Sequence, residues 1–112
     1  MPVFLDYHPI PELPTDLVHR VLTEARRRGY DRAGVRYLDL YCGHDDRVYC
    51  VVEAPNQHAV QMAHADLGLP CREVRLVAGV DAQRPRSTDQ EVIRRAIMDF
   101  AAETAMAELL ED

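Results

Sequence analysis

Two short runs rich in β-branched and aromatic residues, VRYLDLYC (35–42) and RVYCVVEA (47–54), are separated only by the four residues GHDD. Runs of this composition favour strands, and a short polar connection between two of them favours a hairpin. A hairpin in the middle of the chain requires an antiparallel sheet. The segments on either side must therefore extend that sheet or cover its faces.

The segment before the hairpin predicts a strand followed by a helix. MPVFLDYHP (1–9) alternates in the manner of a strand, and the proline-rich residues after it exclude regular structure. Thr15 or Asp16 can cap a helix that carries an apolar stripe at helical spacing and ends at Gly29.

The segment after the hairpin predicts a helix followed by a strand. Asn56 can cap a second helix, Gly68 closes it, and REVRLVAG (72–79) predicts a fourth strand. The resulting order, β-α-β-β-α-β, predicts an α+β fold of the ferredoxin-like type. Its four-stranded antiparallel sheet should have the first and third strands at its centre, in the order 4-1-3-2.

Beyond residue 79 the composition changes. VDAQRPRS (80–87) predicts a polar linker, and Thr88 with Glu91 forms a capping pattern at the start of a long C-terminal helix with one apolar face. We therefore expect a ferredoxin-like domain over 1–79 and a linker with a helical extension over 80–112. The apolar face must be buried on the helix's own sheet or on a second subunit, and we favour the dimer contact.

The overall composition excludes several classes of protein. A chain of 112 residues with a formal net charge of −6 is suited to one domain and lacks the basic surface of a nucleic-acid binder. Apolar stretches long enough to span a bilayer are missing, which predicts a cytoplasmic protein without membrane contact. Three cysteines without a CxxC pair do not predict a disulfide framework.

Alternation along the strands predicts one apolar and one polar face of the sheet. If Val3 and Leu5 face the two helices, the same face should carry Leu38, Leu40, Val48, Cys50, Val52, Val74 and Leu76. The other face then holds a set of ionisable and aromatic side chains, which includes Asp6, His8, Tyr37, Asp39, Tyr49, Glu53, Glu73 and Arg75. Burying such a face is costly unless it binds water, protons, a cation or another ligand.

Several segments in this order resemble a known family. MPVFLDYHPIP, DLVHRV, GVRYLDLY, VYCVVEAPNQHAVQMAHADLGLP and REVRLV are similar to the small nickel-binding protein family, ferredoxin-like proteins once known only as a domain of unknown function. The resemblance covers about residues 2–79. It implies a homodimeric α/β barrel, formed by two sheets packed face to face, that binds nickel without an established enzymatic reaction.

The candidate nickel ligands follow from donor chemistry. Ni(II) accepts imidazole nitrogen together with carboxylate or water oxygen. Asp6 and His8 share a face of the first strand, and Glu53 ends the third, so these three are the first choice. His19 is a further candidate that could equally be a packing residue. His64 could be a ligand or could complement the dipole of its helix.

These features predict a cytoplasmic homodimer that binds nickel or another divalent transition metal for sequestration or sensing. The alternative is a small-molecule-binding barrel protein or enzyme that uses Asp6, His8 and Glu53 as acid/base groups. Its ligand cavity would be lined by Tyr37, Asp39, Tyr49, Glu73 and Arg75. A third possibility is an interaction module that docks through its C-terminal helix.

Overall fold

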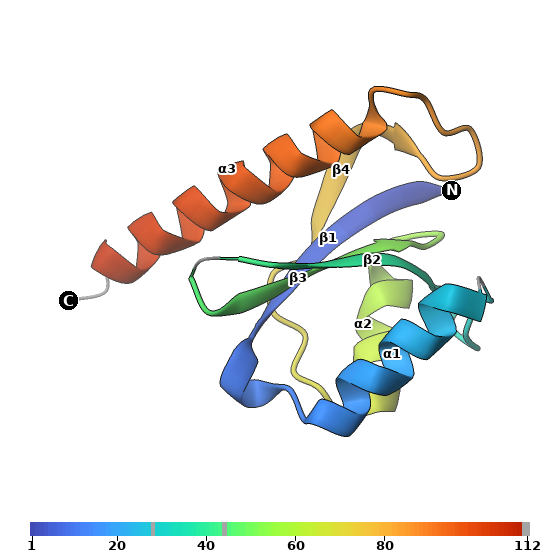
Figure 1. Cartoon of the computed structure of the whole chain (residues 1–112), viewed down its shortest axis with the longest axis horizontal. Helices are drawn as coiled ribbons and strands as arrows, with labels where there is room; N and C mark the ends of the chain where they lie inside the picture. The colour runs from blue at the N-terminus through green and yellow to red at the C-terminus, as the bar shows by residue number, and fades with distance from the viewer. Residues whose placement is uncertain (28, 44, 111–112) are drawn as a thin grey trace.

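The chain folds around one antiparallel sheet of four strands with helices on both sides (Figure 1). The computed structural model describes residues 1–27, 29–43 and 45–110. Its strands are β1 (Pro2–Pro9), β2 (Arg36–Cys42), β3 (Arg47–Glu53) and β4 (Arg75–Asp81). Its helices are α1 (Thr15–Arg27), α2 (Gln57–Leu67) and α3 (Asp89–Leu110), with a short 3₁₀ turn η1 (Ile10–Glu12) after β1.

The topology confirms the ferredoxin-like fold. The strand order β2-β3-β1-β4 places β1 and β3 at the centre of the sheet, and each neighbouring pair is antiparallel. Local signals set the ends of α2 as predicted. The Asn56 side chain accepts a hydrogen bond of 2.9 Å from the Ala59 amide, and Gly68 closes the helix at a φ of 70°.

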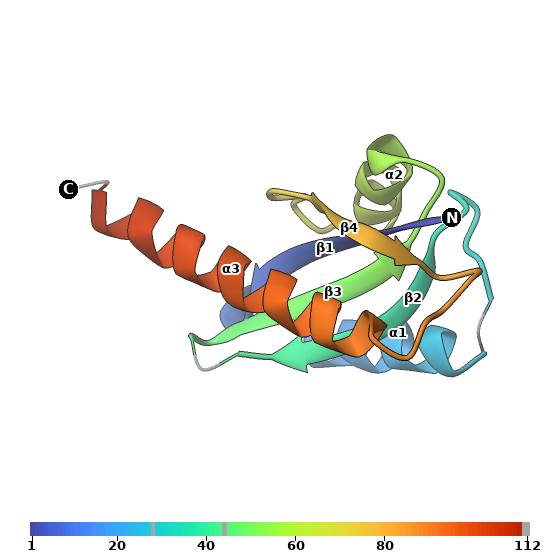
Figure 2. The same ribbon diagram turned by 90° about the horizontal axis from the view of Figure 1, so that it is seen from above.

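The two faces of the sheet are covered by different helices. Figures 1 and 2 show α1 and α2 on one side and α3 running across the other. Ile93 and Phe100 of α3 are buried in a cluster with Val3, Leu5 and other side chains of the sheet. We favoured a dimer contact as the place where the apolar face of α3 is buried. This prediction was wrong. This face packs on its own sheet.

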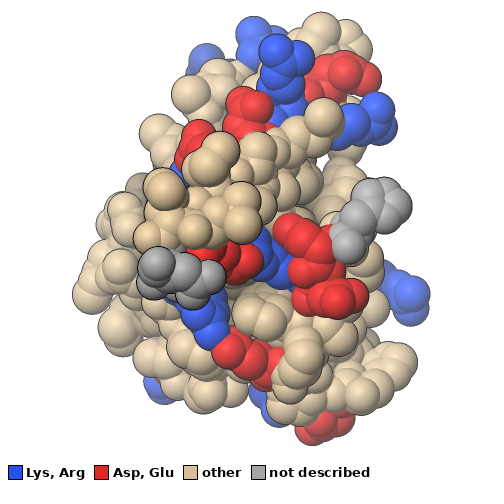
Figure 3. Space-filling view, turned by 90° about the vertical axis from the view of Figure 1, so that its left-hand side faces the viewer, with Lys and Arg blue, Asp and Glu red and all other residues tan. Residues whose placement is uncertain are grey.

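Arg47, at the start of β3, fixes the distal half of α3 to the sheet. Its guanidinium lies over the Tyr7 ring, 4.8 Å from the centroid, and donates a hydrogen bond of 2.5 Å to the Thr104 hydroxyl. It also forms an ion pair with Glu108. Figure 3, which looks onto this end of the molecule, shows acidic and basic side chains gathered side by side beneath the helix.

The face assignment of β1 differs from the prediction. In the register with β3, Asp6 lies opposite Cys50 and His8 opposite Val48, so these four side chains share a face, and that face is covered by α1 and α2. Val3 and Leu5 face α3 instead. The expectation that they face the first two helices was wrong. A third helix covers the second face of the sheet, so that face also carries apolar residues. The alternation of apolar and polar residues alone therefore does not show which face of the sheet is covered by α1 and α2.

An irregularity in β2 sets which of its residues face α1 and α2. The register with β3 shifts between Tyr37 and Asp39. As a result Tyr37 and Leu40, three residues apart, line the same space, while Leu38 packs against the cluster under α3. The prediction that Leu38 and Leu40 share a face was wrong for this reason.

Candidate metal centre

β1 and α2 bring three potential metal ligands to one point. Nε2 of His8 lies 3.4 Å from Oδ2 of Asp6 and 3.1 Å from Nε2 of His64, and Asp6 also pairs directly with His64. One donor atom from each of the three side chains lies within 4.8 Å of the other two. All three residues are buried, with exposures of 2 % for Asp6, 3 % for His8 and 7 % for His64.

A backbone contact orients His64. Its Nδ1 lies 2.7 Å from the carbonyl oxygen of Val60, one turn earlier in α2. Because a carbonyl can only accept a hydrogen bond, Nδ1 carries the proton and donates it. In the neutral imidazole this leaves the lone pair on Nε2, which faces Asp6 and His8. Metal-ligating histidines are commonly held by such a contact to the other ring nitrogen.

The charges in the cluster depend on one another. Burial acts to raise the pKa of the Asp6 carboxyl, but hydrogen bonding and attraction from His64 and His8 outweigh it and hold the pKa below its ordinary value. Burial acts to lower the pKa of His64, while Asp6 and the Val60 carbonyl raise it above the ordinary value. The Asp6 carboxylate and the His64 imidazole therefore stabilise each other's charged forms in this buried space.

Two polar atoms of the cluster lack hydrogen-bond partners. Oδ1 of Asp6 and Nδ1 of His8 are buried and make no hydrogen bond to any residue that the structure describes. A buried polar atom without a partner costs about 1–3 kcal/mol, and an ion or an ordered water at the site is one of its ordinary explanations. The orphaned Asp6 oxygen and the donor set both fit a divalent transition metal.

The cluster borders a small cavity between the sheet and the helices α1 and α2. The cavity has a volume of about 30 Å³. Apart from the cluster, its walls are largely apolar and include Leu17 and Val21 of α1 and Val60 of α2. This volume has room for a water molecule or an ion. Pockets for organic ligands are roughly 300–1,000 Å³, so the cavity suits an ion far better than a substrate.

Glu53, the third member of the first-choice ligand set, lies elsewhere. It is opposite Val3 in the register and so points to the face covered by α3, away from Asp6 and His8. There it is fully buried, accepts a hydrogen bond of 2.6 Å from the Tyr30 hydroxyl, and pairs with Arg36. The acid/base group of Asp6, His8 and Glu53 considered for an enzyme is therefore not assembled in this fold.

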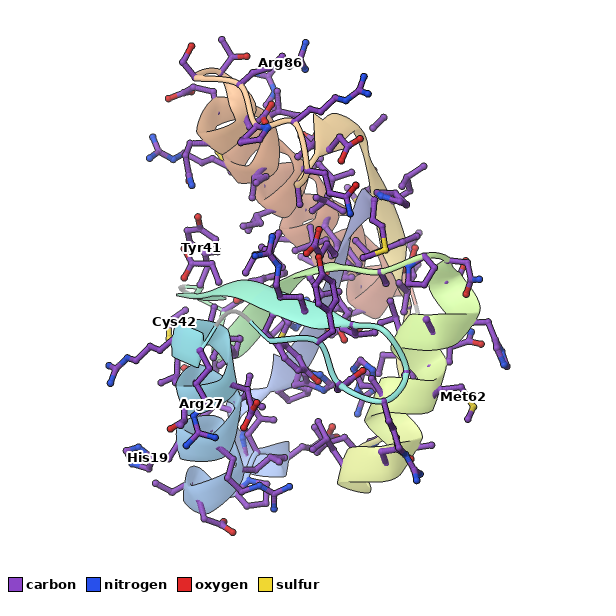
Figure 4. All side chains as sticks on the ribbon, turned by 90° about the vertical axis from the view of Figure 1, so that its right-hand side faces the viewer. His19, Arg27, Tyr41, Cys42, Met62 and Arg86 are labelled. Atoms are coloured by element: carbon purple, nitrogen blue, oxygen red, sulfur yellow. The ribbon has the colours of Figure 1, made fainter. Side chains whose placement is uncertain are left out.

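His19 is also separate from the cluster. It is exposed on α1, and Figure 4 shows its side chain pointing away from the body of the molecule. His19 instead borders a larger surface cleft of about 400 Å³ beside α1.

The residues predicted to line one ligand cavity are divided between the two faces. Tyr37 lines the cavity of the cluster. Tyr49 and Arg75 lie on the face of α3, where Arg75 stands over the Phe100 ring at 4.4 Å and Tyr49 donates a hydrogen bond of 2.6 Å to Asp45. Asp39 and Glu73 are exposed.

The sequence contains a signal that favours His64 as a metal ligand more strongly than its place outside the first-choice set. Val60, Ala63 and Leu67 repeat at intervals of three and four and mark the side of α2 that faces the sheet. His64 adjoins this stripe, four residues after Val60, whereas His58 does not and is exposed. Helical spacing therefore separates a buried histidine from a solvated one in the same helix.

Across residues 1–27, 29–43 and 45–110, none of the helices combines the length and apolar character needed to cross a membrane.

The chain is similar to a family of known proteins and to a solved structure. The family model described as "Nickel responsive protein SCO4226-like" matches residues 4–77. Among solved structures, the crystal structure of SCO4226 from Streptomyces coelicolor A3(2) matches with a TM-score of 0.49 and 21 % identity, and the match covers 70 % of this chain and 99 % of that one. No curated protein matches the chain significantly. The family match spans more than half of the sequence, and the chain belongs to the SCO4226-like family of nickel-responsive proteins.

Proposed function

We propose that this protein binds one nickel ion per chain through Asp6, His8 and His64, and that it sequesters or senses the metal. The observation that carries the proposal is the convergence of three donor atoms in a buried cavity with room for an ion. Two imidazole nitrogens and a carboxylate oxygen form a donor set that Ni(II) accepts. The family description supports nickel among the divalent transition metals.

Each residue has a distinct part in this proposal. Asp6 supplies negative charge, His64 is pre-oriented by its hydrogen bond to Val60, and His8 completes the set from β1. The apolar walls exclude water, so the attraction between the carboxylate and a cation is screened less than at the surface. The ligands are held on a central strand and a helix, which keeps their geometry fixed.

The homodimer and the cytoplasmic location remain part of the proposal. Exposed apolar side chains on β4 and α3 support a contact with a second copy: Leu76, Met98, Met106, Leu109 and Leu110. Asp6, His8 and His64 come from a single chain, so nickel binding itself does not require the partner.

Nickel titration of purified variants tests the proposal. We expect wild-type protein to bind one nickel ion per chain, measured by isothermal titration calorimetry. Loss of a residue that only hydrogen-bonds to a metal ligand typically weakens metal binding by roughly 10–100-fold. His8→Ala and His64→Ala each remove a direct ligand, so each should weaken nickel binding by at least this much.

The matched controls are His19→Ala and His58→Ala, which each remove one exposed histidine and should leave the affinity unchanged. Circular dichroism confirms that each variant is folded. A wild-type protein that takes up no nickel would refute the proposal. So would a loss of affinity in His19→Ala with none in His8→Ala.

A further inference from the structure

Cys50 occupies a special position beside the cluster. It lies directly opposite Asp6 in the pairing of β1 with β3, so the two side chains project from neighbouring strands on the same face. Directly opposed side chains in an antiparallel pair have Cβ atoms about 4.5–5.5 Å apart. Cys50 is buried and lines the same cavity as Asp6, His8 and His64.

The three-residue cluster leaves coordination positions to be filled. Zinc sites with three protein ligands take a fourth donor, and octahedral sites take six. Here the wall around the cluster is largely apolar, so few other protein atoms can serve. Cys50 lines this space from the strand next to Asp6. Oδ1 of Asp6 is buried beside this space without a hydrogen-bond partner among the described residues, which is a second observation that points to a ligand there.

We propose that the Cys50 sulfur is a fourth protein ligand of the nickel ion, so that the site offers two nitrogens, one oxygen and one sulfur. This inference rests on the proposed function. A nickel–sulfur bond replaces a bond from nickel to water, and the thiol proton passes to solvent without any change in oxidation state. Metal coordination deprotonates a thiol that would otherwise stay neutral.

A thiolate in the ligand set changes which metals the site accepts. Soft sulfur donors favour late transition metals, whereas Mg²⁺ and Ca²⁺ prefer oxygen alone. The site would then bind nickel in the presence of abundant magnesium. The two imidazole nitrogens already favour nickel over magnesium, and a thiolate strengthens that preference.

Absorption spectroscopy during nickel titration tests the assignment, because only a bound thiolate gives an intense sulfur-to-nickel charge-transfer band in the near ultraviolet. The chain has three cysteines, so Cys42→Ser/Cys71→Ser leaves Cys50 as the sole thiol. We expect this double variant and the wild type to develop the same band, saturating at one nickel per chain. Cys50→Ser should lose the band and bind nickel at least about 10-fold more weakly.

The double variant keeps the test valid even if Cys50→Ser fails to fold, since both replaced cysteines lie outside the buried core. Nickel binding by the double variant without the band overturns the assignment and leaves the three-ligand site standing. A band that persists in Cys50→Ser also overturns it. Absence of any nickel binding in the wild type, measured by calorimetry, refutes the proposed function as well.

Discussion

Phe100→Ala is expected to lower the free energy of unfolding by about 3–5 kcal/mol, the usual cost of removing a buried aromatic ring. The ring is fully buried. It meets Tyr7 edge-on at 5.2 Å between centroids and Tyr49 at 6.3 Å, and the Arg75 guanidinium lies over it. Urea denaturation followed by circular dichroism measures the change.

Met98→Ala is the matched control for this prediction, because Met98 lies on the same helix with 62 % of its surface exposed. Its effect should stay within about 0.5 kcal/mol. Equal, small effects of the two substitutions would contradict the packing of α3 on its own sheet. A large effect of Phe100→Ala alone would establish α3 as part of the folded core.

Nickel is expected to stabilise the wild-type protein strongly. At a nickel concentration about 100 times the dissociation constant, binding to the folded state alone adds about 2.7 kcal/mol to the free energy of unfolding. For a domain of this size the melting temperature should rise by roughly 10 °C. Differential scanning calorimetry with and without nickel measures the shift.

The shift should disappear in His64→Ala and persist in His58→Ala, which removes a histidine from the exposed side of the same helix. Magnesium at the same concentration should produce no shift, because a site built largely from nitrogen donors suits it poorly. An equal rise in both variants would indicate binding at surface groups and would contradict the buried site.

The elements of the fold could be predicted because local chemistry marks them. Asn56 and Gly68 bound α2 through a side-chain cap and a left-handed backbone, and both act within a few residues. The two β-rich runs pair with each other as the neighbouring antiparallel strands β2 and β3, which lie close together in the sequence. Once these elements are ordered along the chain, the ferredoxin-like topology follows from few alternatives.

The faces of β1 could not be predicted in the same way. Val3 and Leu5 are apolar, as expected of residues under a helix, but the helix that covers them is α3, which begins at Asp89. Asp6 and His8 are buried under α1 and α2, although they are polar, because His64 is positioned to meet them. Both outcomes depend on contacts between residues far apart in the sequence.

The position of Glu53 also depends on contacts that the sequence alone does not reveal. A carboxylate at the end of a central strand looks like a ligand when only its strand is considered. Its face depends on the register, and a shift of one residue reverses it. In the observed register Glu53 lies opposite Val3 and forms contacts with Tyr30 and Arg36 instead of the cluster.

Anomalous diffraction at the nickel absorption edge, measured from crystals of nickel-loaded protein, locates the bound ion directly. We expect an anomalous peak in the cavity beneath α1 and α2, within bonding distance of Asp6, His8 and His64. A fully occupied peak at His19 or His58 with none in the cavity would contradict the proposed site.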